Sequence, residues 1–228
     1  FTSVGSDILT PALSSLASRG LVLDRYYVQP LCTPTRAALL TGRHPMQLGL
    51  QHGVIRDAVP DALPINETTL PQILQRAGYR CYHVGKWHLG FHQHRFTPER
   101  RGFDTSLGYY TGNAEYYNHT SPCWGCGNYT ALDLHVANAS GGWSPILDAA
   151  DKYSTHLFTA AAIDVIRQHA TAYGGVSSSS PTSFSVATAA FSSSSPSSFS
   201  FSSASSFSSA SSASSSAAPL FLYLAYQA

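Results

Sequence analysis

A short helix is marked at both ends in this sequence, by Pro34 and by Gly42. Pro34 favours the first helical position, where its missing N–H costs nothing, and Thr33 is then the expected N-cap. Gly42 can close the helix in a left-handed conformation. Cys32 therefore lies just before the helix, where unpaired backbone N–H groups and the positive end of the helix dipole favour an anion. Because Arg36 in the first turn can reach the same space, we expect a site for a tetrahedral oxyanion beside Cys32.

Helical and strand-like patterns alternate along most of the chain. The expected helices are Pro11–Ser18, Thr69–Ala77 and one from Asp148 or Asp151 to about His169, and the expected strands are Leu21–Gln29 and Tyr79–Val84. This alternation favours an α/β fold with a largely parallel sheet that helices cover on both faces. A strand that leads directly to the start of a helix commonly presents a catalytic group at the carboxyl edge of such a sheet.

Lys86 and His88 follow the second expected strand at a spacing of two. If the chain stays extended there, both side chains point to one side and Trp87 to the other. A cation and an imidazole that share one face suit charge stabilisation and proton transfer. An isolated Lys-x-His is more often a solvated lysine and a loop histidine, so the surrounding residues must decide between the two interpretations.

Two sequence signatures resemble those of the type I sulfatases, and most closely the arylsulfatase B-like branch. The first is Cys-x-Pro-x-Arg at residues 32–36, followed by Leu-Thr-Gly-Arg, and the second is Gly-Lys-Trp-His-Leu-Gly at residues 85–90. The resemblance covers about residues 7–167 and resumes at residue 219. It implies the alkaline phosphatase-like α/β fold of the sulfatases, with a mostly parallel sheet sandwiched by helices, here incomplete. It also favours the functional interpretation of the Lys-x-His pair.

The resemblance implies a role for each residue of the expected site. In this family the cysteine at the position of Cys32 is oxidised to formylglycine, whose hydrate attacks the sulfur of a sulfate ester. Arg36 would orient the hydrate, Lys86 would bind the hydrate or the sulfate, and His88 would accept a proton. A histidine with the ordinary pKa of about 6.5 suits that transfer. A formylglycine-generating enzyme is the implied maturation partner.

A calcium ion that activates the formylglycine is also implied by the resemblance. Of its ligands, this chain would supply only Cys32, as formylglycine. The family's paired metal aspartates would precede Phe1, while an Asp-Asn pair, a second lysine and a histidine would follow Ala228. The chain has neither a signal peptide nor a long apolar span, and we expect it to be an internal fragment. The missing groups favour inactivity of a chain of this length.

The expected function is that of a sulfuric ester hydrolase, an arylsulfatase-like enzyme acting on a small-molecule or carbohydrate sulfate ester. A phosphatase or phosphodiesterase of the alkaline phosphatase superfamily is one alternative, but its nucleophile would usually be Ser or Thr rather than Cys32. A non-catalytic glycosylated remnant is another. The near balance of 13 Lys and Arg against 12 Asp and Glu argues against nucleic acid or an anionic membrane as partner.

Several features indicate the secretory pathway, with the protein secreted or in a lysosome or vacuole. Four Asn-x-Ser/Thr sequons begin at Asn66, Asn118, Asn128 and Asn138. Cys123 and Cys126 lack the strand–helix context of a redox motif and the second pair that a zinc site needs. We expect a local structural disulfide between them, with pairing through Cys81 as the alternative.

Composition divides the chain into three regions. Residues 1–173 are expected to form a partial sulfatase catalytic domain. Residues 174–218 are a low-complexity insert of Ser, Ala and Phe, expected to be disordered because it buries too little apolar surface. The apolar run in 219–228 is expected to resume the domain as a buried strand. Arg100–Asp104 resembles a structural turn near the pocket, whose arginines should pair with acidic neighbours at the surface rather than contact substrate.

Overall fold

The computed structural model describes residues 9–123, 126–127, 129–173 and 217–227, and contacts divide the chain into two compact units, 1–30 and 31–228. In the first unit, α1 (Pro11–Ser18) begins after Thr10 as expected and buries none of its side chains. The strand expected at 21–29 is wrong, because these residues are irregular and contain a turn. Leu21 and Tyr27 are 87% and 88% exposed. Strand propensity is expressed only against neighbouring strands, and this segment forms no β-ladder.

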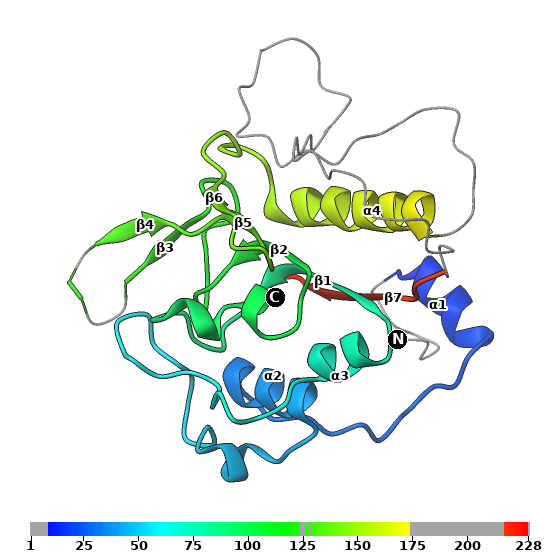
Figure 1. Ribbon diagram of the computed structural model, residues 1–228, viewed down its shortest axis with the longest axis horizontal. Helices are drawn as coiled ribbons and strands as arrows, with labels where there is room; N and C mark the ends of the chain where they lie inside the picture. The colour runs from blue at the N-terminus through cyan, green and yellow to red at the C-terminus, as the bar shows by residue number, and fades with distance from the viewer. Residues whose placement is uncertain (1–8, 124–125, 128, 174–216, 228) are drawn as a thin grey trace. The chain divides into compact units, whose positions relative to one another are not determined.

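A five-stranded sheet forms the centre of the second unit, with strand order β6-β5-β2-β1-β7 (Figure 1). Its strands are β1 (Arg80–Lys86), β2 (Thr105–Tyr109), β5 (His135–Asn138), β6 (Trp143–Pro145) and β7 (Leu220–Ala225). β1 pairs in parallel with both β2 and β7, whereas β5 and β6 add antiparallel pairings. The sheet is thus parallel at β2, β1 and β7 and mixed as a whole, since the short turn between β5 and β6 permits only an antiparallel pair.

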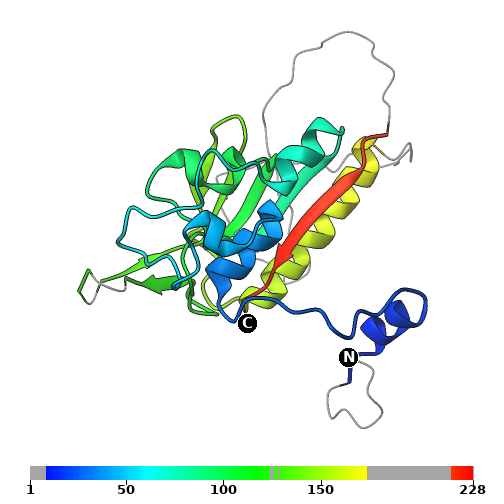
Figure 2. The same ribbon diagram turned by 90° about the horizontal axis from the view of Figure 1, so that it is seen from below.

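Helices pack on both faces of this sheet. α4 (Ser154–Tyr173) packs against β1, β2 and β7, and α3 (Leu70–Arg76) packs against β1 and against α2 (Cys32–Thr41). Figure 2 shows α4 running alongside β7. α4 begins later than expected, because Asp151 has a left-handed φ of 66° and lies before the first helical turn. Among the described residues, no helix is long and apolar enough to cross a membrane.

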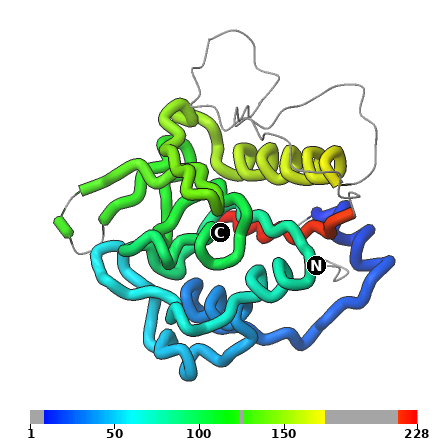
Figure 3. The backbone as a smooth tube through the Cα atoms, viewed as in Figure 1, coloured from blue at the N-terminus to red at the C-terminus, as the bar shows by residue number. Residues whose placement is uncertain are grey.

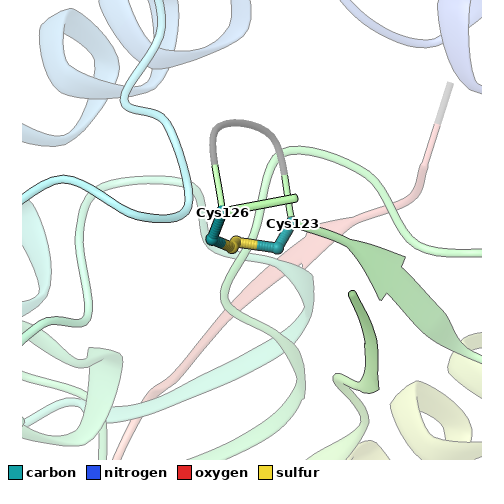
Figure 4. The surroundings of a disulfide bond; sticks show 2 residues. All are labelled: Cys123 and Cys126. Atoms are coloured by element: carbon teal, nitrogen blue, oxygen red, sulfur yellow. A yellow bond between two sulfur atoms is a disulfide. The ribbon is translucent and has the colours of Figure 1, made fainter. Parts of the chain in front are cut away.

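Short elements complete the second unit. They are the 3-10 helices η1 (Pro45–Leu48), η2 (His94–Phe96) and η3 (Pro98–Arg100), and the antiparallel pair β3 (Thr120–Pro122) and β4 (Thr130–Leu132). A disulfide joins Cys123 to Cys126 between β3 and β4 (Figure 4), while Cys81 is buried with a free thiol. This is the local pairing that the sequence favoured. α3 begins close to where the sequence predicts, with Thr69 as its N-cap, and the Thr69 N–H donates to Gln72 Oε1 at 2.9 Å.

Strand alternation separates the core into two clusters. Val84, Leu107 and Leu222 face the side that α4 covers, together with Leu157 and Phe158 of α4. The other side holds residues from α2, β1, β7 and the loops after β1 and before β2, namely Ala37, Leu40, Cys81, Trp87, Phe103, Phe221 and Tyr223. β7 therefore contributes alternate residues to both clusters, as a strand buried between two helical layers does.

β7 comes from a distant part of the sequence and lies directly beside β1 (Figure 3). It confirms the strand expected from the apolar run near the end of the chain, but not its burial, because only Ala225 is buried and Leu224 is exposed. The low-complexity segment falls, except for residues 217 and 218, outside the described residues. The division into regions 1–173, 174–218 and 219–228 stays a prediction.

Arg101 is buried rather than paired at the surface. Its guanidinium donates to the carbonyls of Leu63, Pro64 and Glu67 at 2.9–3.3 Å. The expectation of surface ion pairs is therefore wrong for this arginine, which is 1% exposed. A buried guanidinium needs several acceptors, and the carbonyls of one loop provide them. Arg101 thereby fixes the loop before α3.

Thr33 connects three segments instead of capping α2. The helix begins at Cys32 with Leu31 as N-cap and ends, as expected, at Gly42 with φ 67°. The Thr33 hydroxyl is fully buried. It donates to the His88 carbonyl at 3.1 Å and accepts from the Ile55 N–H at 3.2 Å. This one hydroxyl ties the start of α2 to the chain after β1 and to the loop around residue 55.

Buried histidines predict a loss of stability in acid. Burial lowers the pKa of both His83 and His135 to about 3. In the unfolded chain the same two histidines titrate at the ordinary histidine pKa of about 6.5. Stability is therefore complete above that pH and falls as pH drops toward 3, by about 1.4 kcal/mol per pH unit for each histidine. Urea midpoints at pH 7 and pH 5 measure this. In the control variant His83→Gln, unfolding in acid should take up about one proton fewer, so the free energy of unfolding should depend less steeply on pH. Equal midpoints at the two pH values in the wild type would contradict the prediction.

Thr33→Val should destabilise the protein far more than Thr33→Ser. Valine keeps the shape but leaves a buried carbonyl and a buried N–H unpaired, at about 1–3 kcal/mol each, so we expect a total near ~3 kcal/mol. Serine keeps the hydroxyl and loses one methyl group, at about 1 kcal/mol. Urea unfolding of the two variants gives the comparison. Equal losses would mean that packing, and not the bridge, accounts for the effect.

Candidate active site

β1 delivers Lys86 to the start of α2. The preceding Gly85 has φ 107°, and a Cβ there would overlap the backbone of Ala225 in β7. Only glycine allows the two backbones to come this close with a positive φ, and the strand ends one residue later, at Lys86. Lys86 is 9% exposed, and its side chain lies close enough to that of Cys32 for the two charges to interact. Burial lowers the pKa of Lys86 and the nearby Arg36 lowers it further, while Cys32 opposes the shift.

Arg36 projects from the first turn of α2 toward the same strand end. One of its terminal nitrogens, Nη1, donates to the Lys86 carbonyl at 2.6 Å and to the Tyr223 hydroxyl at 3.1 Å. The structure thus brings Cys32, Arg36 and Lys86 together, as the sequence pattern predicts. Two cations beside one sulfur make this end of the sheet favourable to an anion.

His88 reaches the site by a route that the sequence did not predict. β1 ends at Lys86, and His88 has a left-handed φ of 56°, so the simple alternation of an extended chain does not hold at this residue. Trp87 nevertheless points into the core, where its indole N–H donates to the carbonyls of Gly90 and Phe96, each at 3.1 Å.

The His88 ring has a defined tautomer. Nε2 lies 2.9 Å from the Ile55 carbonyl, which can only accept, so Nε2 carries the hydrogen and Nδ1 keeps its lone pair. Nδ1 is buried and has no hydrogen-bond partner within the described residues. The pKa of His88 is lowered to about 4, mainly by burial and in part by Lys86 and Arg36, against the opposing hydrogen bond to Ile55. The expected ordinary pKa is therefore wrong, and the imidazole is neutral above about pH 4.

Cys32 and His88 line one cavity of about 480 Å³, together with residues 54–57, Gly112 and Asn113. A Cβ at Gly112 would lie 2.7 Å from Cε1 of His88, so the absence of a side chain there lets the imidazole occupy its place. Asp133 anchors this wall by accepting hydrogen bonds from the backbone N–H groups of Tyr110 and Thr111 and from the Thr111 hydroxyl. Three separate segments thus enclose the space in front of Cys32.

The described residues do not fit a calcium site on their own. Calcium takes six to eight oxygen ligands, usually with several carboxylates. In the part of the chain that the structure describes, no group of three or more His, Cys, Asp or Glu side chains is placed to hold a metal. Asp57 is the carboxylate lining the cavity, and the cations Arg36 and Lys86 lie next to Cys32. No step of the chemistry below is therefore assigned to a metal.

Three contributors to the site were missed by sequence reasoning. Thr33 was interpreted as a cap, although its buried bridge depends on residues far along the chain. Asp133 gave no local signal. Tyr223 did give one, because its hydroxyl is the single polar side-chain group on the β7 face that also carries Phe221. A hydroxyl on an otherwise apolar strand face usually has a buried partner.

The sequence of this chain is similar to those of known proteins. A family model described as Sulfatase matches residues 1–210. Arylsulfatase J of Mus musculus is 49% identical over 115 residues, which are 50% of this chain and 19% of that protein. N-acetylgalactosamine-6-sulfatase of Homo sapiens is 40% identical over 107 residues, or 43% of this chain and 20% of that protein. The chain spans about a fifth of the length of the curated relatives it matches.

Solved sulfatase structures share the fold. PsFucS1 sulfatase from Pseudoalteromonas sp. superposes with a TM-score of 0.54 at 24% identity, over 72% of this chain and 36% of that one. Ps i-CgsB in complex with k-i-k-neocarrahexaose gives a TM-score of 0.57 at 20% identity, over 88% and 35%. The expected alkaline phosphatase-like α/β fold is confirmed by these likenesses. On the extent of the family match, this chain belongs to the sulfatase family.

Proposed function

We propose that this chain belongs to a sulfuric ester hydrolase that cleaves small-molecule or carbohydrate sulfate esters, with Cys32 as the precursor of its nucleophile. The observation that supports this most is the convergence of two cations on Cys32 at the start of α2, where Arg36 Nη1 donates to the Lys86 carbonyl at 2.6 Å and the Lys86 side chain lies near Cys32. Names of similar proteins, among them an N-acetylgalactosamine-6-sulfatase, support a carbohydrate substrate class.

Arg36 and Lys86 would stabilise negative charge on the sulfate oxygens. Both lie at the helix start, and Lys86 is largely shielded from water, so their charges act with little screening. The lowered pKa of Lys86 would rise again when an anion binds beside it, because an opposite charge favours the ammonium form. Lys86 would therefore be most fully protonated when sulfate is bound.

His88 would act as a general base through Nδ1. That nitrogen is the unprotonated one, since Nε2 donates to the Ile55 carbonyl. The lowered pKa of His88 keeps the ring neutral in mildly acidic solution, where an ordinary histidine would be half protonated. Proton acceptance at Nδ1 would thus remain available at pH values below 6.

Conversion of Cys32 to formylglycine would supply an aldehyde hydrate, a nucleophile that can be regenerated after each turnover. Cys32 is partly exposed and lines the cavity, so the position has room for the hydrate and contact with Lys86. A formylglycine-generating enzyme would be the maturation partner. A calcium ion, as family resemblance implies, would need oxygen ligands beyond the residues described.

We also propose passage through the secretory pathway, with the protein secreted or in a lysosome or vacuole. The Cys123–Cys126 disulfide supports an oxidising compartment. The sequon asparagines Asn66 and Asn118 are exposed, as glycosylation requires. The sequon at Asn128 begins outside the described residues.

Secreted protein should contain formylglycine at position 32 and should prefer sulfate to phosphate esters. The conversion replaces the sulfur by oxygen and removes two hydrogens, and peptide mass spectrometry over residues 31–36 detects it. Hydrolysis of the sulfate and phosphate esters of one phenol then measures the preference.

Only thiol at position 32 in secreted material would contradict the proposal. Faster turnover of the phosphate ester would assign the chain to a phosphatase instead. A formylglycine-containing protein that cleaves neither ester would favour the non-catalytic remnant.

In a full-length version of the protein, Lys86→Ala and His88→Ala should each lower the rate of sulfate ester hydrolysis by ~100-fold or more, the usual scale for charge-stabilising and proton-transferring groups. His156→Ala, at an exposed position on α4, is the matched control and should leave the rate unchanged.

Because burial lowers the pKa of His88 to about 4, the wild-type rate should persist at pH 5 and decline near pH 4, as the base becomes protonated. A decline centred near the ordinary histidine pKa of about 6.5 would argue against His88 as the base.

A further inference from the structure

The Arg36 guanidinium has one end fully committed to the protein. A terminal guanidinium nitrogen carries two hydrogens. Nη1 of Arg36 directs one to the Lys86 carbonyl at 2.6 Å and one to the Tyr223 hydroxyl at 3.1 Å. Among the described residues no hydrogen bond is seen from Nε or Nη2, so their three N–H groups can serve a ligand. With two acceptors on one nitrogen, rotation about the bonds near the guanidinium is restricted.

Tyr223 is held in place by the sheet and by two ring contacts. Its ring lies opposite His83 in the β1–β7 register and stacks on that imidazole, with centroids 5.8 Å apart and planes at 30°. Phe103 covers it at 6.2 Å. Burial raises the pKa of the Tyr223 hydroxyl, although Arg36 opposes the shift. The hydroxyl therefore stays protonated and neutral, at a position set by the sheet.

We propose that Tyr223 is a positioning residue of the sulfatase site, whose hydroxyl fixes the Arg36 guanidinium so that Nε and Nη2 face the oxyanion. The inference rests on the proposed function. Without the hydroxyl, Arg36 keeps one acceptor on Nη1 and gains a rotational freedom that must be lost again when the anion binds. Small misplacements of a charged group in a catalytic site reduce the rate strongly.

The competing explanation is that Tyr223 only fills the core, next to Phe103 and His83. Tyr223→Phe separates the two, because it keeps the ring and removes the hydroxyl alone. Tyr226→Phe is the matched control. Tyr226 lies three residues after Tyr223, and its hydroxyl hydrogen-bonds to the Thr159 hydroxyl at 2.6 Å.

Nitrogen-15 NMR of arginine side chains tests the positioning directly, without substrate. Wild-type Arg36 should give separate, slowly exchanging Nη signals, which should merge in Tyr223→Phe and stay separate in Tyr226→Phe. Averaged Arg36 signals in the wild type, or unchanged signals in Tyr223→Phe, would overturn the proposal. The wild-type spectrum keeps the test valid even where Tyr223→Phe does not fold.

Kinetics provide the second readout. Tyr223→Phe should lower kcat for a sulfate ester by ~10-fold and change KM by less than about twofold, because the Arg36 interaction strengthens as charge develops. In an Arg36→Met background, Tyr223→Phe should cause no further loss of kcat. Additive losses would show that Tyr223 acts independently of Arg36. If the full-length wild type does not hydrolyse sulfate esters, the proposed function fails, and the NMR spectra alone decide the role of Tyr223.

Discussion

The site depends on one buried hydroxyl, that of Thr33. It accepts from the loop N–H of Ile55 and donates to the carbonyl of His88, so the start of α2 is tied to two of the segments that line the cavity. The His88 ring returns to the same loop through the Ile55 carbonyl. These bonds close a small ring of contacts among buried residues, where each unmade bond is costly. The geometry around Cys32 is therefore largely set before any ligand arrives.

Burial also determines the chemistry of the charged groups. Lys86 and His88 both have lowered pKa values, first because of desolvation and then because Arg36 is close. The result is a neutral imidazole next to cations, which is the protonation state that a base needs. Such shifts are common where residues act on a substrate, since the protein holds charges together that water would separate.

Local patterns in the sequence identified the parts of this structure, but the contacts between distant parts had to come from the fold. Pro11, Gly42 and Gly78 mark helix ends through backbone rules that act over a few residues, and the apolar run 220–225 forms a strand. The segment 21–29 has the composition of a strand but forms no β-ladder, and a local pattern does not show whether a neighbouring strand is present. For the same reason the bridge at Thr33, the burial of Arg101 and the pKa of His88 were misjudged. Arg36 and Tyr223 meet across 187 positions, and no spacing rule covers that distance.

The parallel pairing of β7 with β1 has a consequence for the order of events on the ribosome. β1 is synthesised long before its neighbour, and a parallel partner at such a separation is slow to find. Until then, one edge of β1 and the face that stacks on Tyr223 stay uncovered. The nascent polypeptide therefore passes through an interval in which Arg36 lacks one of its two anchors and an apolar strand edge is open to chaperones or to aggregation.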